Sequence, residues 1–309
     1  MLKPTKFDYK SIFFSDTSSD TSDDLQSSLA SVDDLSNDLS NDFPMKSSTF
    51  NIDIEMSKAY KKNESKILSE SIRPIANGIY ANYNSLNIIV GAQGKGKSHI
   101  VLRDIIQISR LKDAFHLIVY ISKNGVINDS TFDAQRELIK LPVKVISDSN
   151  AENYLKELDL WKELYEKYMN NNISLSTEKV NNMLSFLGIS QRDTTKKSLN
   201  TVILCEDFIK SKLLKSSYFT NYITQLRHKH SIVYINVQFF KAIPTDYKNN
   251  CTSFFIFNGF SRQKMHYIYQ QVVMPIEFED LWKRYYVMKN HDFVLVNTRE
   301  NSIDFISCM

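Results

Sequence analysis

The chain has 309 residues, 42% of them hydrophobic and 24% charged, a balance typical of a soluble globular protein with one large domain or two ordinary ones. Its net charge of +3 hides an asymmetry, because residues 1–45 hold nine aspartates and three lysines, a charge of −6 that leaves +9 for the rest. Three cysteines without paired spacing argue against a disulfide framework or a structural zinc site, and no apolar run approaches the ~20 residues of a membrane span.

The N-terminal segment differs in composition from the remainder. Residues 15–48 consist mainly of Ser, Asp, Asn and Thr, which bury too little apolar surface to offset the entropy of ordering. We therefore expect residues 1–70 to be a disordered acidic tail without a secretory signal, and residues 71–309 to be the folded domain. The tail is either a solvated low-complexity segment or an acidic-hydrophobic peptide that docks on a partner, through leucines at positions 25, 29, 35 and 39.

From residue 86 onward, short apolar runs alternate with segments of helical periodicity. The apolar runs predict strands at 86–90, 117–121, 143–146, 201–205, 232–237 and 254–257, with two short candidates at 293–297 and 303–307. The periodic segments predict helices at 98–111, 151–169, 218–227, 262–272 and 276–286. Residues 170–198 are polar and predict a long connection with at most a short helix near 183–187. This alternation predicts an α/β fold with a mainly parallel central sheet flanked by helices.

The strongest motif lies between the first predicted strand and the first predicted helix. Residues 91–98 read Gly-Ala-Gln-Gly-Lys-Gly-Lys-Ser and match G-x-x-x-x-G-K-[ST], the phosphate-binding loop of P-loop NTPases. Glycines let successive N–H groups converge on a phosphate, and the following helix adds its N-terminal dipole. Lys97 would bind the β- and γ-phosphates of ATP, and the Ser98 hydroxyl would bind Mg²⁺. The residues assigned to nucleotide binding are Gly91, Gln93, Gly94, Lys95, Gly96, Lys97, Ser98 and His99.

Two carboxylates follow the predicted strand 201–205. Glu206 and Asp207 would lie at the carboxyl edge of the sheet, where open α/β sheets bind ligands. One would hold Mg²⁺ and the other would orient the attacking water. Position along the strand assigns Glu206 to the metal and Asp207 to the water, but the Glu-Asp order leaves open which of the two activates water.

Two further residues have the chemistry of a catalytic site. Gln238 follows the predicted strand 232–237 and could report the γ-phosphate. Arg227 ends the preceding helix and could serve as an arginine finger for a neighbouring subunit in a ring. Its alternatives are a favourable interaction with the helix C-terminus or a contact with DNA phosphate, and Arg262 is a weaker candidate for the finger.

The order of these motifs resembles the genome-packaging ATPases of the FtsK–HerA superfamily, as found in virophages, polinton-like elements and large DNA viruses. The resemblance covers residues 70–309 and is carried by 226–238, which is similar to the family's Arg-His, strand and Gln segment. Residues 242–250 are similar to its Pro-x-x-x-Arg-x-Asn segment, and 254–257 occupies its next strand position. Two departures are the Glu-Asp order and Lys248 in place of the more usual arginine.

The resemblance implies an ATPase in which Glu206 and Asp207 form the Walker B pair and Gln238 is the sensor. It also implies a homo-oligomeric ring that threads double-stranded DNA into a capsid. The protein would then be found in the virion or in a cytoplasmic virus factory, and we expect no membrane partner. A basic body behind an acidic tail suits a DNA partner, and the tail could contact the capsid or portal vertex. The alternatives are a non-catalytic ATP-binding scaffold or switch, and a small-molecule P-loop kinase.

Overall fold

The central element is a mixed β-sheet. The computed structural model describes residues 73–74, 79–111, 114–127, 129–189, 199–206 and 210–308, so the tail predicted for residues 1–70 lies outside the described residues. Within them, the sheet has nine strands in the order β1-β9-β8-β7-β2-β6-β5-β3-β4. The strand bounds are Arg73–Pro74 for β1, Leu86–Val90 for β2, Leu117–Ser122 for β3, Val143–Ser147 for β4, Thr201–Cys205 for β5, Ser231–Val237 for β6, Ser253–Phe257 for β7, Phe293–Asn297 for β8 and Ser302–Ser307 for β9.

Strand direction decides which loops meet at each edge of the sheet. Strands β7, β2, β6, β5, β3 and β4 pair in parallel, so their carboxyl ends share one edge. In the described sheet β8 alone runs antiparallel to both of its neighbours, with Phe293 opposite Phe257. The turn that enters β8 therefore lies at the same edge as the loops that leave the parallel strands.

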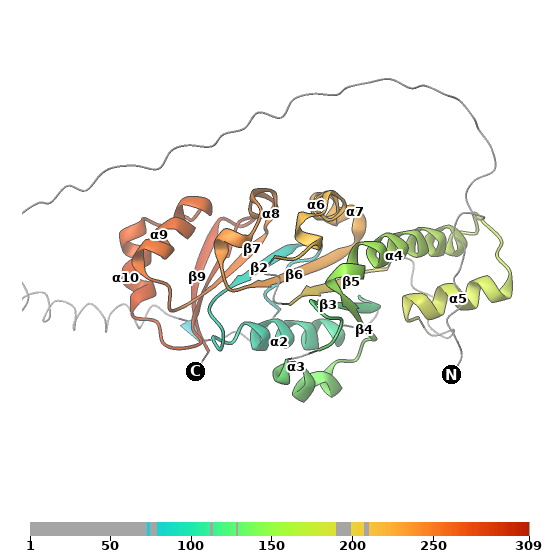
Figure 1. Cartoon of the computed structure of the whole chain (residues 1–309), viewed down its shortest axis with the longest axis horizontal. Helices are drawn as coiled ribbons and strands as arrows, with labels where there is room; N and C mark the ends of the chain where they lie inside the picture. Colours follow the sequence, from blue (N-terminus) through green and yellow to red (C-terminus); the bar gives the residue numbers. More distant parts are fainter. Residues whose placement is uncertain are drawn as a thin grey trace, which may run out of the picture. The chain divides into compact units, whose positions relative to one another are not determined.

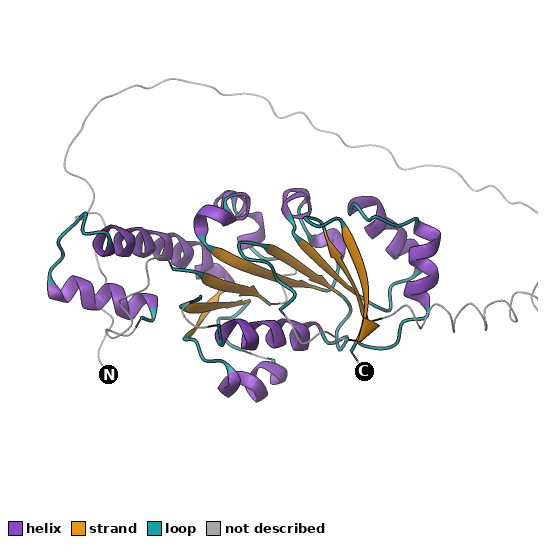
Figure 2. Ribbon diagram, turned by 180° about the vertical axis from the view of Figure 1, so that it is seen from behind, coloured by secondary structure: helices purple, strands orange, loops and turns teal. Residues whose placement is uncertain are grey.

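Helices cover both faces of the sheet. Figures 1 and 2 show α2 and α3 on one face and α4, α6, α7, α8, α9 and α10 on the other. The helix bounds are Lys97–Ser109 for α2, Ser130–Gln135 for α3, Asp148–Met169 for α4, Thr177–Leu187 for α5, Ser217–Thr224 for α6, Leu226–Lys229 for α7, Thr245–Asn250 for α8, Arg262–Gln271 for α9 and Phe278–Tyr286 for α10. Short 3-10 turns lie at Arg136–Leu138, Leu213–Lys215 and Phe240–Ala242. None of the described helices combines the length and the apolarity needed to cross a bilayer.

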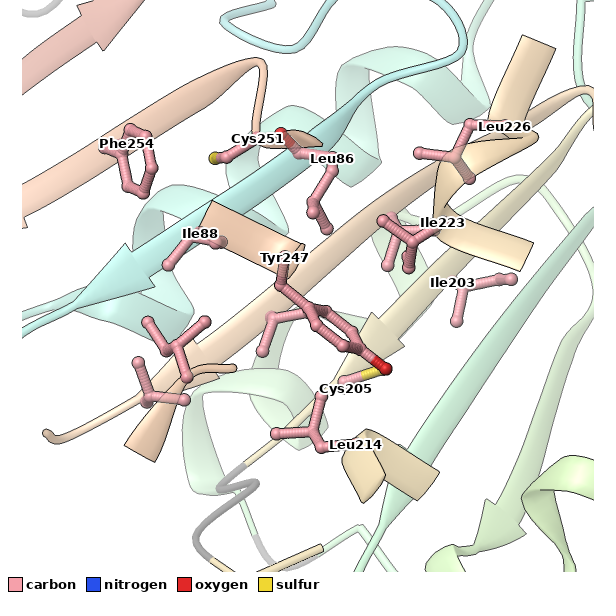
Figure 3. Close-up of a cluster of buried hydrophobic side chains, with 14 of the residues drawn as sticks. Leu86, Ile88, Ile203, Cys205, Leu214, Ile223, Leu226, Tyr247, Cys251 and Phe254 are labelled. Atoms are coloured by element: carbon pink, nitrogen blue, oxygen red, sulfur yellow. Dashed lines mark hydrogen bonds between the residues drawn. The ribbon is translucent and has the colours of Figure 1, made fainter. Parts of the chain in front are cut away.

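Each face has its own apolar core, because alternate residues of a buried strand point to opposite sides of the sheet. Leu86 and Ile88 of β2 pack with α4, α6 and α8, whereas Ile89 packs with α2. Figure 3 shows Tyr247 of α8 lying over β2, β6 and β5, among Ile88, Cys205 and Leu214. Burial on both faces explains why these strands are mostly apolar.

Most of the predicted elements are confirmed, with bounds that differ by a few residues, and the α/β class with a mainly parallel sheet is correct. The long connection predicted for 170–198 is wrong, because Thr177–Leu187 forms helix α5. Ser176 caps this helix by accepting the Lys179 N–H, Gly188 ends it in a left-handed conformation, and Met183, Leu184 and Leu187 are buried against the core. The short helices α3 and α8 were not predicted.

Candidate active site

The glycine-rich loop connects β2 to α2 at the carboxyl edge of the parallel strands. Its first residue, Gly91, donates its N–H to the Val237 carbonyl over 3.2 Å, which ties the loop to the end of β6. A β-carbon at Gly91 would lie 2.7 Å from the Phe257 β-carbon, so β7 leaves no space for a side chain there. Gly94 and Gly96 have φ values of 74° and 93°, in the left-handed region that favours glycine. The loop, the helix that follows it and the order of the central strands are those of a P-loop NTPase fold.

Lys97 and Ser98 begin α2 and face the interior of the loop. The Lys97 Nζ donates to the Gly91 carbonyl over 2.8 Å and to the Ala92 carbonyl over 2.9 Å. The Ser98 hydroxyl donates to Glu206 Oε1 over 3.3 Å. A phosphate anion would offer the Lys97 ammonium a stronger, charge-assisted partner than these two carbonyls.

Glu206 lies one residue beyond β5 and is held from two sides. Its Oε2 accepts a 2.6 Å hydrogen bond from Asn236 Nδ2, while Oε1 accepts from Ser98. Burial raises the pKa of Glu206 to about 7 and the charge of Asp129 adds to the shift, although the hydrogen bonds from Asn236 and Ser98 oppose it. The protonated and ionised forms of this carboxyl are therefore present in comparable amounts at neutral pH.

The oxygen atoms beside Glu206 suit Mg²⁺, which prefers oxygen ligands, keeps several waters and binds with substrate phosphates. Ser98 Oγ and Glu206 Oε1, which are 3.3 Å apart, are the two protein oxygens that would hold it. Among the described residues there is no cluster of three or more His, Cys, Asp or Glu that could hold a metal by itself.

A pocket of about 730 Å³ opens beside these groups. Of the residues assigned from sequence, Gln93, Gly94, Gly96, Lys97, Ser98, His99, Glu206 and Gln238 line it. Gly91 is packed against Phe257, and Lys95 instead donates to Asn290 Oδ1 over 2.8 Å. Asp207 lies outside the described residues.

Several pocket residues carried no motif in the sequence: Tyr120, Asp129, Asn236 and His291. Asn236 could have been found from the sequence, because it is a polar residue within a mostly apolar predicted strand. The structure shows that it is buried. Asp129 caps α3 by accepting the Thr131 N–H over 2.8 Å. Burial and then the charge of Glu206 raise the pKa of Tyr120 above its usual range, so this phenol stays neutral.

Arg227 lies away from the pocket of its own chain. It lies in α7 before β6, and β6 runs parallel to β2, so Arg227 is at the edge of the sheet opposite the glycine-rich loop. The seven residues of β6 separate the two edges by roughly 20 Å. Arg299 lies nearby and donates to the Tyr83 and Asn84 carbonyls, and its pKa is lowered by burial and then by the charge of Arg227.

No protein-family model matches the sequence, and no curated protein matches it. Similar solved structures include B204, the DNA-packaging ATPase from Sulfolobus turreted icosahedral virus, with a TM-score of 0.47 and 11% identity over 74% of this chain and 100% of that chain. The pCW3 conjugation coupling protein TcpA has a TM-score of 0.44 and 13% identity over 72% of this chain and 59% of its own. EssC (ATPases 2 and 3) from Geobacillus thermodenitrificans has a TM-score of 0.48 and 12% identity over 76% of this chain and 46% of its own.

All of these similarities lie at 13% identity or less, so they concern the fold alone. Another B204 structure, from Sulfolobus turreted icosahedral virus 2, contains ATP-gammaS, at 10% identity and a TM-score of 0.46 with this chain. At these identities, the function of this chain has to be inferred from its own residues.

Proposed function

We propose that this chain is an ATP-driven double-stranded DNA translocase that packages a viral genome into a capsid. The observation that carries the ATPase part is the convergence of Lys97, Ser98, Glu206 and Gln238 on one pocket. They come from the ends of the neighbouring strands β2, β6 and β5. DNA as the substrate is supported by the resemblance of residues 226–250 to packaging ATPases and by the +9 charge of residues 46–309.

Binding of ATP would exchange the two carbonyl partners of Lys97 for phosphate oxygens. Ser98 and Glu206 would then hold Mg²⁺, which when bound neutralises charge on the phosphates. Asn236 fixes the Glu206 carboxylate through the 2.6 Å hydrogen bond. We propose that Asp207 orients the attacking water and that Gln238 detects the γ-phosphate from the end of β6.

A homo-oligomeric ring would give Arg227 a catalytic role. Since this arginine lies at the far edge of the sheet, it would act on the nucleotide of a neighbouring subunit and stabilise charge in the transition state. The acidic tail, residues 1–70, is proposed to contact the capsid or portal vertex, which would place the protein in the virion or the virus factory.

Hydrolysis of ATP by the purified full-length protein, with and without double-stranded DNA, tests this function. We expect hydrolysis that rises with DNA, falls steeply as salt is added, and is lost in Lys97→Ala. Binding of ATP without hydrolysis would favour the scaffold or switch. Hydrolysis indifferent to DNA would favour a kinase or another P-loop enzyme.

A further inference from the structure

The turn formed by residues 289–292 lies against the glycine-rich loop although almost two hundred positions separate them in the sequence. It reaches this edge because β8 is antiparallel to β7, which puts Phe293 beside Phe257 at the carboxyl end of β7. Asn290 Oδ1 accepts the 2.8 Å hydrogen bond from Lys95. A β-carbon at Gly96 would lie 3.3 Å from His291 Nδ1, so the imidazole is adjacent to the residue before Lys97.

The turn is held firmly by buried groups. The Asp292 carboxylate accepts the Lys289 N–H over 2.7 Å and the Cys308 N–H over 3.2 Å, and Asp292 is 1% exposed. Asn258, just after β7, donates its backbone N–H to the Asp292 carbonyl over 3.0 Å and its side-chain amide to the Met288 and Lys289 carbonyls. His291 itself has a φ of 73°, a left-handed conformation that a histidine adopts at some cost. The structure thus fixes the backbone of the turn that carries the exposed His291 side chain.

His291 faces the pocket from the side opposite Glu206. The strand order places β6 and β5, with Gln238 and Glu206, on one side of β2, and β7 and β8, with His291, on the other. If the terminal phosphate of a bound nucleotide lay beside Glu206 and Gln238, its nucleoside could lie at the other end of the loop, beside the turn that enters β8. Because His291 lines the same pocket, its imidazole is where the ribose would pass.

We propose that His291 is a nucleotide-positioning residue that hydrogen-bonds the ribose of the bound nucleotide. An imidazole can donate to or accept from a hydroxyl, and Asn290 Nδ2, 3.2 Å from His291 Nε2, steadies the ring. This proposal rests on the nucleotide-binding part of the proposed function and does not depend on DNA translocation. It makes the turn that enters β8 part of the nucleotide site.

The test compares a nucleotide with an anion that lacks a nucleoside. The affinities of ATP, ADP and inorganic tripolyphosphate, each with Mg²⁺, are measured by titration calorimetry on the full chain. His291→Asn is the test variant, because asparagine tolerates the left-handed conformation but is too short to replace the imidazole. We expect ATP and ADP to bind about five- to tenfold more weakly, the effect of one lost hydrogen bond, and tripolyphosphate to bind within about twofold of the wild type.

The controls separate this effect from damage to the loop. His266→Asn, on the exposed side of α9, should leave all three affinities unchanged, and Lys97→Ala should weaken all three. The thermal midpoint of His291→Asn reports whether the turn still folds, and His291→Gly, which removes the side chain without backbone strain, should reproduce the loss. Equal weakening of ATP and tripolyphosphate, unchanged ATP binding, or a wild type that binds no nucleotide would each overturn the proposal. If the nucleoside-specific loss is found but DNA does not stimulate hydrolysis, the translocase proposal fails and the role of His291 stands.

Discussion

Two carboxyl groups in this protein have similarly raised pKa values and very different surroundings, since Asp104 is buried and Glu206 is only partly buried. Burial raises the pKa of both Glu206 and Asp104 to about 7. Glu206 faces the pocket and is held by the side chains of Ser98 and Asn236. Asp104, in α2, accepts the Tyr80 and Ala81 N–H groups, each over 3.2 Å, and the Tyr234 hydroxyl over 3.3 Å.

The difference shows that a raised pKa alone does not identify a catalytic acid. The partners of Asp104 are two backbone N–H groups and a buried phenol, so its carboxyl fastens the 79–82 segment to α2. The partners of Glu206 lie at the ends of two neighbouring elements that border the nucleotide pocket. A carboxyl can bind a cation in place of a proton only if it is accessible from the pocket, as Glu206 is and Asp104 is not. Replacing each acid by its amide should therefore change ATP hydrolysis to different extents.

Replacing each acid by its amide gives the largest expected contrast. Glu206→Gln removes the charge that would hold Mg²⁺ and should lower ATP hydrolysis by about 100-fold or more. Asp104→Asn should leave the rate within about twofold, since this residue touches no part of the pocket. Steady-state hydrolysis measured under one set of conditions checks both. Similar losses in the two variants would mean that Glu206 acts through folding rather than chemistry.

The hydrogen bond from Asn236 should tune Glu206 by a smaller amount. Asn236→Ala is expected to lower kcat by about tenfold, because the carboxylate loses the partner that orients it. The same hydrogen bond lowers the pKa of Glu206, so its loss should raise that pKa further.

The pH profile of kcat/KM reports this shift. In the wild type the rate should fall as the pH drops through about 7, where Glu206 takes up a proton. In Asn236→Ala this acid limb should move to higher pH. A profile that keeps its midpoint, with a lower plateau, would indicate that Asn236 contributes to the rate without acting on the carboxyl.

We expect Asp104 to affect the free energy of unfolding rather than the rate of ATP hydrolysis. Its folded pKa of about 7 lies above the ordinary aspartate value of 3.8, so the unfolded chain loses this proton first as the pH rises. Folding stability is therefore complete below about pH 4 and is lost progressively up to about pH 7. Asp104→Asn removes this loss while keeping an acceptor oxygen, and should stabilise the protein by about 1–2 kcal/mol at pH 8.

Urea unfolding of wild type and Asp104→Asn at pH 8 and pH 5 measures this effect. The advantage of the amide should shrink at pH 5, because the wild-type carboxyl is then protonated in the folded state. Destabilisation of equal size at both pH values would contradict the role of Asp104 as a structural carboxyl whose pKa is raised by burial.

The sequence predicted those parts of the fold and of the candidate site that depend on local pattern. The mostly apolar segments 86–90 and 201–205 and the glycine-rich string 91–98 are each local in the sequence, so the loop, Lys97, Ser98 and Glu206 could be located without coordinates. Asn236 could have been found as a polar residue in a buried strand. The short helices α3 and α8, at six residues each, have too little periodicity to be recognised.

His291 and Asp129 could not be found in this way, because their positions depend on tertiary structure. Lys95 and Asn290 meet across 195 positions, and they do so only because β8 turns back antiparallel on β7. Asp129 looks like an ordinary helix cap in sequence, and its place in the pocket follows from the pairing of β3 with β5. The role of Arg227 depends on a second subunit, which a single chain does not contain.

The position of β8 and β9 also has a consequence for the order of folding. Strand β7 is paired with β2 on one side, but its other side is covered only when residues 293–297 have been added. Arg73, the first residue of β1, pairs with Ile306 of β9, so the outermost ladder closes last during synthesis on the ribosome. Until then β7 is an open edge that can pair with another chain. A nascent chain that stops before β8 would thus carry the complete glycine-rich loop, yet lack both the turn that steadies it and the strand that protects its sheet from aggregation.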